Sequence, residues 1–337
     1  MIDFRSDTVT LPSPAMLQAM MNAPLGDDVY GDDPTVIDLE QWAAQQHGFE
    51  AAIFCSSGTQ ANLLALMAHC ERGDEYLCGQ QAHNYKFEGG GAAVLGSIQP
   101  QPIDNENDGS LSFAKLTSAI KPVDPHFART TLLSLENTIN GKVLSLAYLQ
   151  QAREFVNLHA LQLHLDGARV YNAATALGVD IKEISQYFDS MSICLSKGLG
   201  APVGSLLLGD KKLIAKARRW RKVLGGGMRQ VGILAAAGKY ALTENVTRLA
   251  ADHANARYLA EQLSLLEGVS VNPALVQTNM VFAKLDPAIN QQKLQDTLKA
   301  QGILFAAGNP VRLVTHLGIS RIDIETFLTV LKQALKI

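Results

Sequence analysis

The sequence predicts an α/β fold with a largely parallel sheet, followed by a smaller α+β domain. Strand-like apolar runs alternate with helical patterns through the first two-thirds of the chain, which is typical of a parallel sheet covered by helices. From about Thr243 the segments become shorter, beginning with a helical apolar pattern over residues 245–268. We therefore expect a large domain over residues 1–242 and a small C-terminal domain over residues 243–337, packed together without a flexible linker.

The other elements follow from local signals. Asp33 and Pro34 supply a cap and a first-turn proline for a helix that Gly48 ends. A short strand is expected at residues 51–55, and the pattern TQANLLALMAHC after it is helical. Further strands are expected at residues 131–135, 161–165, 191–195 and 204–208.

Composition and charge disfavour several classes of protein. Hydrophobic residues make up 47% of the chain and charged residues 18%, as in a globular rather than a disordered protein. The formal net charge of -3 disfavours nucleic-acid binding. No apolar run reaches the roughly 20 residues of a membrane span, and the start MIDFRSDTVTLPSP lacks the apolar core of a signal peptide. The four cysteines lack metal-ligand spacing, so we expect no metal and buried, reduced thiols in a cytoplasmic protein: Cys55, Cys70, Cys78 and Cys194.

The most informative region carries an acid and an amine at the ends of two strands. Asp166 follows the run 161–165, and Lys197 follows the run 191–195 and enters a glycine-rich turn. About thirty residues separate them, the span of one strand–helix–strand unit, and α/β sheets bind ligands at this carboxyl edge. Pyridoxal phosphate chemistry needs such a pair, because a lysine holds the aldehyde as a Schiff base and a carboxylate keeps the ring nitrogen protonated. Taken alone, a lysine is usually a surface cation and an Asp-Gly pair often caps a turn.

A candidate phosphate site lies at a strand-to-helix junction. Gly58 lets the backbone approach closely, while Ser57 and Thr59 offer hydroxyl groups beside the free N–H groups of a helix start. A serine-rich helix cap would need the same residues. The phosphate assignment therefore gains most of its weight from Lys197 elsewhere in the chain.

Three further side chains are candidates for binding or catalysis. His83 can stack on a pyridine ring and exchange protons near neutral pH, with Glu88 close enough in sequence to orient it; a lone histidine is more often a structural hydrogen-bonder. Arg169 follows Asp166 by three residues and could bind the ring phenolate or a substrate carboxylate. His126 lies in a Pro-Val-Asp-Pro-His loop that is expected to be exposed.

The basic segment KKLIAKARRWRKVLGGGMRQ is interpreted mainly as the solvated face of a helix. The triple glycine at residues 225–227 predicts a bend after this helix. Such a bend could present one or two cations, Arg229 among them, to a phosphate group.

The chain resembles, nearly end to end, the low-specificity L-threonine aldolases, which are pyridoxal-phosphate enzymes of the aspartate-aminotransferase fold (type I), and six strings carry the resemblance. The strings are FRSDTVT, SGTQAN, HNYKFEGGGAAVLG, HLDGAR, LSKGLGAPVGSLLLG and RWRKVLGGGMRQ. The resemblance implies a mostly parallel seven-stranded sheet in the large domain and a smaller α+β domain at the C-terminus. It also implies a homotetramer whose active sites lie at a dimer interface.

The resemblance assigns roles to individual residues. It implies that Lys197 forms the Schiff base, that Asp166 contacts the ring nitrogen, and that His83 stacks on the ring. It implies phosphate contacts from Ser57, Gly58 and Thr59, substrate-carboxylate contacts from Ser6, Arg169 and Arg312, and cofactor contacts in a neighbouring subunit from Lys222 and Arg229. One position departs from the pattern, because Ile139 stands where relatives often carry a histidine in the cavity wall.

The implied reaction is the retro-aldol cleavage of L-threonine, L-allo-threonine and related β-hydroxy-α-amino acids to glycine and an aldehyde. We hypothesise that His83, directly or through a water, takes the hydroxyl proton and that His126 helps to place the hydroxyl. An aminotransferase or a β-eliminating lyase on the same scaffold is an alternative, as is a non-catalytic cofactor-binding regulator. Whether a structural cation binds near Thr8 and Thr10 is left open.

Overall fold

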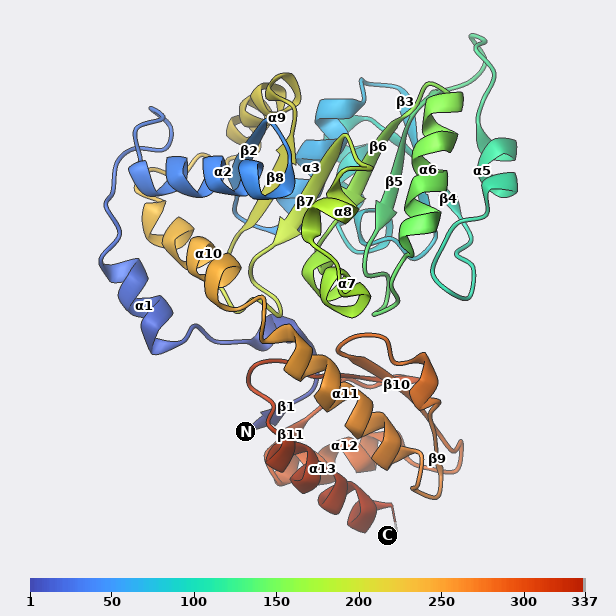
Figure 1. Ribbon diagram of the computed structural model, residues 1–337. Helices are drawn as coiled ribbons and strands as arrows, with labels where there is room; N and C mark the ends of the chain where they lie inside the picture. The colour runs from blue at the N-terminus through green and yellow to red at the C-terminus, as the bar shows by residue number, and fades with distance from the viewer. Residues whose placement is uncertain (336–337) are drawn as a thin grey trace.

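The computed structural model describes residues 1–335 and contains a seven-stranded sheet in its larger unit (Figure 1). The strand order is β2-β8-β7-β6-β5-β3-β4, and every neighbouring pair from β7 to β4 is parallel, whereas β8 is antiparallel to β7 and β2. The expected mostly parallel seven-stranded sheet is confirmed. Its strands are β2 Ala51–Cys55, β3 Asp74–Gly79, β4 Gln99–Ile103, β5 Arg129–Glu136, β6 Gln162–Asp166, β7 Ser190–Cys194 and β8 Ser205–Gly209.

Helices cover both faces of this sheet. Along β5, Leu133 and Leu135 pack with residues of α2, α6 and α10, whereas Leu132 packs on the opposite face with residues of α3. Because both faces are buried, the strands read as continuous apolar runs rather than as alternating patterns. The helical elements of the larger unit are α1 Pro14–Met21, α2 Pro34–His47, α3 Gly58–His69, α4 His83–Lys86, η2 Ala92–Gly96, α5 Phe113–Ala119, α6 Leu146–Leu158, α7 Val170–Leu177, α8 Ile181–Ser185, α9 Lys211–Val223 and α10 Gly232–Glu244.

The predicted signals at the ends of α2 are confirmed. Asp33 precedes the helix, and its Oδ1 accepts hydrogen bonds from the backbone N–H groups of Thr35 and Val36 at 3.1 Å each. Gly48 follows the helix with a φ of 73°, a left-handed conformation that glycine adopts without strain.

A second unit lies beyond the edge of the sheet at which β6 ends (Figure 1). It contains a three-stranded antiparallel sheet in the order β12-β10-β9, covered by helices on one face. Its elements are α11 Leu249–Leu263, β9 Val269–Ser270, η3 Pro273–Leu275, β10 Met280–Leu285, α12 Gln291–Ala300, β11 Ile303–Leu304, β12 Val311–Val314 and α13 Arg321–Ala334.

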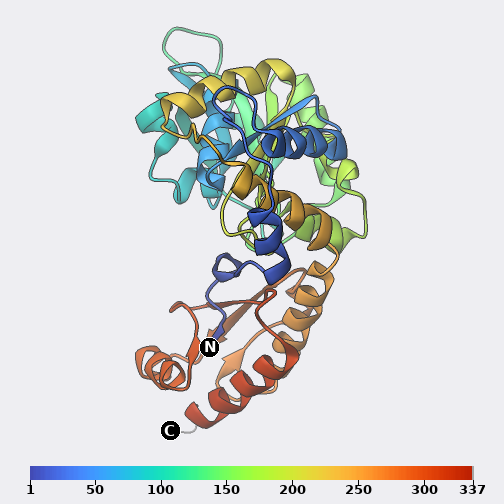
Figure 2. The same cartoon turned by 90° about the vertical axis from the view of Figure 1, so that its left-hand side faces the viewer.

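The N-terminus belongs structurally to this second unit. Strand β1, Ile2–Asp3, pairs in parallel with β11, and the N-terminus lies against the smaller unit (Figure 2). Phe4 is fully buried in the second hydrophobic core against Phe327. The sequence grouped these residues with the large domain, because a two-residue strand carries no periodicity. The next segment, η1 Asp7–Val9, returns the chain to the larger unit, where α1 contacts α10.

The chain passes between the two units at the turn that joins α10 to α11 (Figure 1). The helical pattern expected from residue 245 begins as a helix only at Leu249. Residues 245–248 instead form the turn, and Asn245 caps the end of α10. None of the helices within residues 1–335 has the length and apolar character needed to cross a bilayer.

Candidate active site

The candidate site lies at the carboxyl edge of the parallel strands. Asp166 is the last residue of β6 and lies opposite Glu136, the last residue of β5. Lys197 follows three residues after the end of β7, the next strand in the sheet. The strand order therefore brings the acid and the amine that the sequence singled out to one edge of the sheet.

Asp166 is held in place by a network of amide and hydroxyl groups. Its side chain is 2% exposed, and its Oδ2 accepts a hydrogen bond from Asn62 Nδ2 at 2.7 Å. The same Asn62 nitrogen lies 2.8 Å from Glu88 Oε1, and Ser192 Oγ donates to Asn62 Oδ1 at 2.8 Å. The network leaves Asp166 Oδ1 bonded to the backbone N–H of Ala168 at 3.0 Å. Its carboxylate is thus fixed by two donors, as a buried charge requires.

His83 lies in the same cluster, at the start of the short helix α4. Its Nδ1 lies 2.7 Å from Glu88 Oε1, and its backbone N–H donates to Glu136 Oε2 at 2.8 Å. The hydrogen bond to Glu88 raises the pKa of His83, partial burial opposes the rise, and the charges of Asp166 and Glu88 add to it. The ring Nε2 makes no hydrogen bond to another described residue, so it is free to face a ligand.

Glu136 differs from the other acids of the cluster. Burial and the adjacent Asp166 carboxylate raise the pKa of Glu136 to about 8, although the His83 backbone bond and the charges of Lys197 and His83 act in the opposite direction. The carboxyl group is therefore mostly protonated at neutral pH. The Glu136 carboxyl group thus lies beside Asp166 in its neutral form.

The N-terminal segment reaches into the site through Asp7. Arg169 Nε donates to Asp7 Oδ2 at 2.8 Å and Arg169 NH2 donates to Asp7 Oδ1 at 2.6 Å. Burial alone would raise the pKa of Asp7, but the charges of Arg169 and Lys197 and bonds from Arg169 and Asn279 hold it at about 2. Asp7, Asn62 and Glu136 were not predicted from the sequence, because burial of a polar residue leaves no periodic signal. For Asp7 and Asn62, the strings SDT and SGTQAN were the available clue.

The two arginines proposed for the substrate carboxylate are near each other. Arg312 lies on β12 opposite Phe282 of β10, and its NH2 donates to the carbonyl of Arg5 at 3.2 Å. Burial and the positive charge of Arg169 lower the pKa of Arg312. Ser6 lies on the same N-terminal segment, where it accepts the N–H of Thr8 at 3.3 Å as the cap of η1.

The candidate phosphate site has the expected strand-to-helix geometry. Ser57 caps α3 by accepting the N–H of Gln60 at 3.1 Å, and the helix begins at Gly58. Thr59 is exposed in the first turn. A Cβ at Gly58 would lie 3.7 Å from Ser205 Oγ, a buried hydroxyl without a hydrogen-bond partner in residues 1–335. An anion at this turn would meet free N–H groups and an unsatisfied hydroxyl.

Three candidates lie apart from this cluster within one chain. His126 precedes β5 at the amino end of the sheet, its side chain is 84% exposed, and its Nδ1 contacts Asp124. The loop from α5 to β5 opens at that end, because β5 is parallel to its neighbours. Lys222 is exposed near the end of α9, and Arg229 is half-exposed and pairs with Asp27 at 2.9 Å.

Ile139 lies three residues beyond the carboxyl end of β5 and borders a small cavity that Glu136 also lines. Its side chain is 4% exposed and packs beside Gly109, where a Cβ would lie 2.2 Å from Ile139 Cγ2. Ile139 is therefore a buried apolar residue in the wall of this cavity, and its effect on the site stays a prediction.

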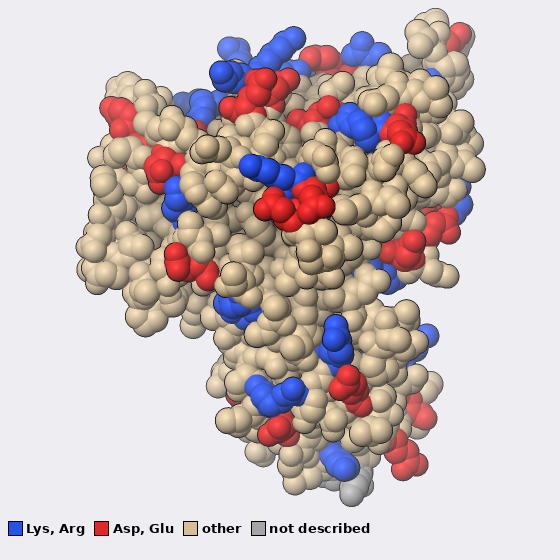
Figure 3. All heavy atoms as spheres, viewed as in Figure 1, with Lys and Arg blue, Asp and Glu red and all other residues tan. Residues whose placement is uncertain are grey.

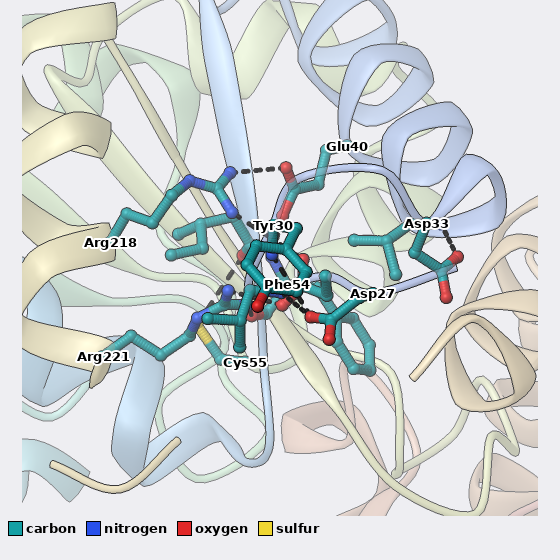
Figure 4. Close-up of polar contacts among 12 residues, drawn as sticks. Asp27, Tyr30, Asp33, Glu40, Phe54, Cys55, Arg218 and Arg221 are labelled. Atoms are coloured by element: carbon teal, nitrogen blue, oxygen red, sulfur yellow. Dashed lines mark hydrogen bonds and ion pairs between the residues drawn. The ribbon is translucent and has the colours of Figure 1, made fainter. Parts of the chain in front are cut away.

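The basic helix α9 is anchored by acids rather than only solvated. Arg221 is 3% exposed, donates to the Phe54 carbonyl at 2.6 Å and pairs with Asp28 at 2.6 Å, while Arg218 pairs with Glu40 at 2.6 Å (Figure 4). Acidic side chains accordingly lie beside basic ones on the face drawn in Figure 3. The expectation of a solvated face is wrong for Arg221, because the charge pattern could not reveal Asp28 as a buried partner.

Potential metal ligands occur within the same cluster. His83, Glu88 and Asp166 each offer an atom within 4.8 Å of the others. Asn62 Nδ2 already donates hydrogen bonds to the carboxylates of Glu88 and Asp166. All four cysteines are free and buried, as expected.

Comparison with known proteins identifies the class of this fold and site. The family model described as beta-eliminating lyase matches residues 3–286. The low specificity L-threonine aldolase of Escherichia coli K12 is 60% identical over 321 residues, which cover 95% of each chain. The chain belongs to the beta-eliminating lyase family, and within it to the low-specificity L-threonine aldolases.

Solved structures agree with this assignment at the level of the fold. A threonine aldolase from Leishmania major superposes with a TM-score of 0.84 at 21% identity, covering 99% of both chains. A structure of SPT with its pyridoxal phosphate superposes with a TM-score of 0.77 at 17% identity, covering 99% of this chain and 87% of the other. The chain therefore has the fold of pyridoxal-phosphate enzymes of type I.

Proposed function

We propose that this protein is a pyridoxal-phosphate-dependent aldolase that cleaves L-threonine, L-allo-threonine and related β-hydroxy-α-amino acids to glycine and an aldehyde, acetaldehyde for these two. The observation that carries the proposal is the cluster of Asp166, His83 and Lys197 at one edge of the sheet. The names of the E. coli relative and of the L. major structure support the reaction.

The residues present fit the cofactor. Asp166 offers a buried carboxylate for the ring nitrogen, and Gly58 with the orphaned Ser205 hydroxyl offers a cradle for the phosphate, which Ser57 and Thr59 extend. Lys197 would hold the aldehyde covalently. When bound, the cofactor supplies an aldehyde that captures an amine and a ring that accepts the electron pair released at the α-carbon.

Arg312 and Ser6 are proposed to bind the substrate carboxylate. Arg312 offers a planar fork beside the site, and Ser6 lies next to the buried Asp7. Asp7 already occupies Nε and NH2 of Arg169. Arg169 is therefore better placed to bind the ring oxygen of the cofactor than to bind the substrate carboxylate with two hydrogen bonds. A fixed carboxylate would orient the bond between the α- and β-carbons for cleavage.

His83 is proposed as the base that takes the β-hydroxyl proton, directly or through a water. Glu88 holds Nδ1, so the proton would be accepted at Nε2. A base whose pKa lies near the working pH can both accept the proton and release it again. The bond to Glu88 raises the pKa of His83, so the neutral imidazole that accepts the proton prevails only at a higher pH than in an unpaired histidine.

We propose that the protein is a cytoplasmic homotetramer whose active sites are shared between subunits. In such an assembly the remaining candidate residues would reach the site of a neighbouring subunit. Lys222, Arg229 and His126 are exposed within one chain and are expected to face a neighbour's site, with His126 placing the substrate hydroxyl. Large exposed apolar side chains near His83 support a covered surface there: Phe87 is 62% exposed, Val94 74% and Leu95 53%. We propose that the site lies between domains formed by residues 1–242 and 243–337, with strand β1 attached to the second.

The deciding experiment follows acetaldehyde with a coupled alcohol dehydrogenase while the cofactor-loaded protein is incubated separately with L-threonine and L-allo-threonine. Release from both substrates is the expected result for a low-specificity aldolase. Silence from both, with the cofactor bound, would overturn the proposal. Consumption of a keto acid without glycine release would instead identify an aminotransferase, and release of ammonia with a keto acid would identify a β-eliminating lyase.

A further inference from the structure

Three consecutive backbone carbonyls around Lys197 each accept a hydrogen bond from a side chain outside their own turn. Thr10 Oγ1 donates to the Lys197 carbonyl at 2.9 Å, and Arg248 NH1 donates to the Gly198 carbonyl at 3.2 Å. Asn245 Nδ2 donates to the Leu199 carbonyl at 2.7 Å. The turn that carries the lysine is thus fixed residue by residue from outside.

The turn would be poorly defined without these contacts. It contains Gly198 and Gly200, and Gly200 has a φ of 80°, so the local backbone has wide conformational freedom. Two backbone bonds close it, from the Gly200 N–H to the Lys197 carbonyl at 2.9 Å and from the Ala201 N–H to the Leu195 carbonyl at 3.0 Å. A long lysine side chain on such a backbone reaches a fixed point only if the carbonyls are held.

The three donors come from two segments that are distant in sequence. Thr10 follows η1 in the N-terminal segment. Asn245 and Arg248 begin and end the turn between α10 and α11, where the chain passes from the larger unit to the smaller one. The lysine turn is therefore held by the junction of the two units.

Arg248 also connects the lysine turn to the strand that carries Arg312. Its guanidinium pairs with Asp252, which is 1% exposed, and the Asp252 carbonyl accepts the hydroxyl of Thr315 at 2.7 Å. Thr315 follows Arg312 by three residues, directly after β12. A contiguous path of bonds thus joins the proposed carboxylate-binding strand to the backbone next to Lys197.

We infer that Thr10, Asn245 and Arg248 are positioning residues for Lys197, and that Arg248 couples the orientation of the lysine to the strand of the smaller unit that bears Arg312. The inference rests on the proposed role of Lys197. The competing explanation is that these bonds merely satisfy buried carbonyls, in which case their loss would lower stability without changing the lysine.

The test compares the variants Arg248→Lys, Thr10→Val and Asn245→Ala with a matched control, Arg153→Lys. Arg153 is 23% exposed against 26% for Arg248, and it likewise binds a backbone carbonyl, that of Tyr187, and a carboxylate, that of Asp189. It does so beside Asp189 at the start of β7, the end of that strand opposite Lys197. Thr10→Ser retains the hydroxyl and serves as the conservative counterpart of Thr10→Val.

Two readouts report on the lysine itself in the cofactor-loaded protein. The first is the pH midpoint of the visible absorbance of the bound cofactor, which we expect to move by about 0.5 unit in Arg248→Lys and Thr10→Val, because one hydrogen bond is lost. The second is the rate at which glycine displaces the lysine, which we expect to fall about tenfold through misplacement of the amine. Thr10→Ser and Arg153→Lys should match the wild type in both.

Midpoints and displacement rates that stay at the wild-type values in all three variants would overturn the inference, as would an equal change in Arg153→Lys. Asn245→Ala and Thr10→Val keep the test decisive if Arg248→Lys does not fold. Borohydride reduction followed by peptide mapping tests the proposed role of Lys197 separately from the role of the three positioning residues. Cofactor fixed to a residue other than Lys197 would overturn the proposed site and the inference together, whereas unchanged variants with cofactor on Lys197 would overturn the inference alone.

Discussion

Asp7 and Arg169 form a two-pronged ion pair that joins the N-terminal segment to the turn after β6. The carboxylate is fully buried and the guanidinium side chain is 12% exposed. An ion pair of this kind is weak evidence for stability as a whole, but removing one partner leaves the other charge buried and unpaired. The relationship therefore makes a sharp prediction for single substitutions.

Asp7→Asn is expected to lower the free energy of unfolding by about 3 kcal/mol, because the Arg169 charge is left without its partner. Urea unfolding of the cofactor-free protein measures this loss. Asp3→Asn is the matched control, because Asp3 pairs with Arg5, whose side chain is 51% exposed, and such pairs contribute about 0–1 kcal/mol. Equal losses in the two variants would contradict the prediction.

Protonation of Asp7 at acid pH should lower the free energy of unfolding. The pKa of Asp7 lies at about 2 in the folded protein, against 3.8 for an ordinary aspartate. Its stabilising effect is complete above pH 3.8 and is lost as the pH falls from 3.8 towards 2. Unfolding free energies measured between pH 5 and pH 2 should therefore decline less steeply in Asp7→Asn than in the wild type.

Glu136 predicts a pH dependence of the opposite sign. Its pKa rises from 4.5 to about 8 on folding, so the unfolded chain ionises this group at a pH where the folded protein does not. Stability should fall as the pH rises from 4.5 to 8, by at most about 1.4 kcal/mol per pH unit from this group. Glu136→Gln should flatten the profile in that window, whereas Glu106→Gln, at an exposed pair with Lys115, should leave it unchanged.

Asn62 is expected to matter for cofactor affinity. The substitution Asn62→Leu removes the donor that Asp166 Oδ2 and Glu88 Oε1 share and leaves two acids facing each other without it. Loss of a hydrogen bond to a charged group costs about 1.5–3 kcal/mol, so the dissociation constant of pyridoxal phosphate should rise about 10- to 100-fold. Titration by absorbance measures it, and an unchanged constant would contradict the prediction that the Asn62 bond to Asp166 supports cofactor binding.

His83→Phe tests the proposed base. The aromatic ring keeps the stacking surface but cannot accept a proton, so kcat should fall about 10²- to 10⁴-fold while the cofactor stays bound. Turnover close to wild type with bound cofactor would assign the base elsewhere. Glu88→Gln should shift the acidic limb of the pH–rate profile to lower pH, because Glu88 is the main cause of the raised pKa of His83.

The helices and strands were predicted well from the sequence, whereas the contacts of the buried polar residues were not. The strand at residues 51–55 and the caps of α2 are as expected, and β6, β7 and β8 differ from the expected ranges by one residue. Strand β4 was missed because its sequence, QPQPI, carries prolines that are tolerated at a sheet edge. Local apolar patterning is sufficient for buried strands because both of their faces need apolar side chains.

A site residue could be predicted from the sequence where it lies just after the end of a predicted strand. Asp166 and Lys197 met this condition, since parallel order brings their strand ends together. Asp7 and Arg248 did not, because each acts on a residue far away in sequence and only the folded chain shows the pairing. His126 could not be placed for a related reason, because its loop opens at the opposite end of the sheet within one chain.

The pairing of β1 with β11 sets the order in which this protein can be completed during synthesis. Ile2–Asp3 are synthesised long before their partner strand, Ile303–Leu304. Phe4 and the Asp7 segment cannot take their final places until then, because Phe4 packs in a core built from residues beyond 255. The nascent chain therefore carries Phe4 and the Asp7 segment without their final contacts until the residues beyond 255 have been made.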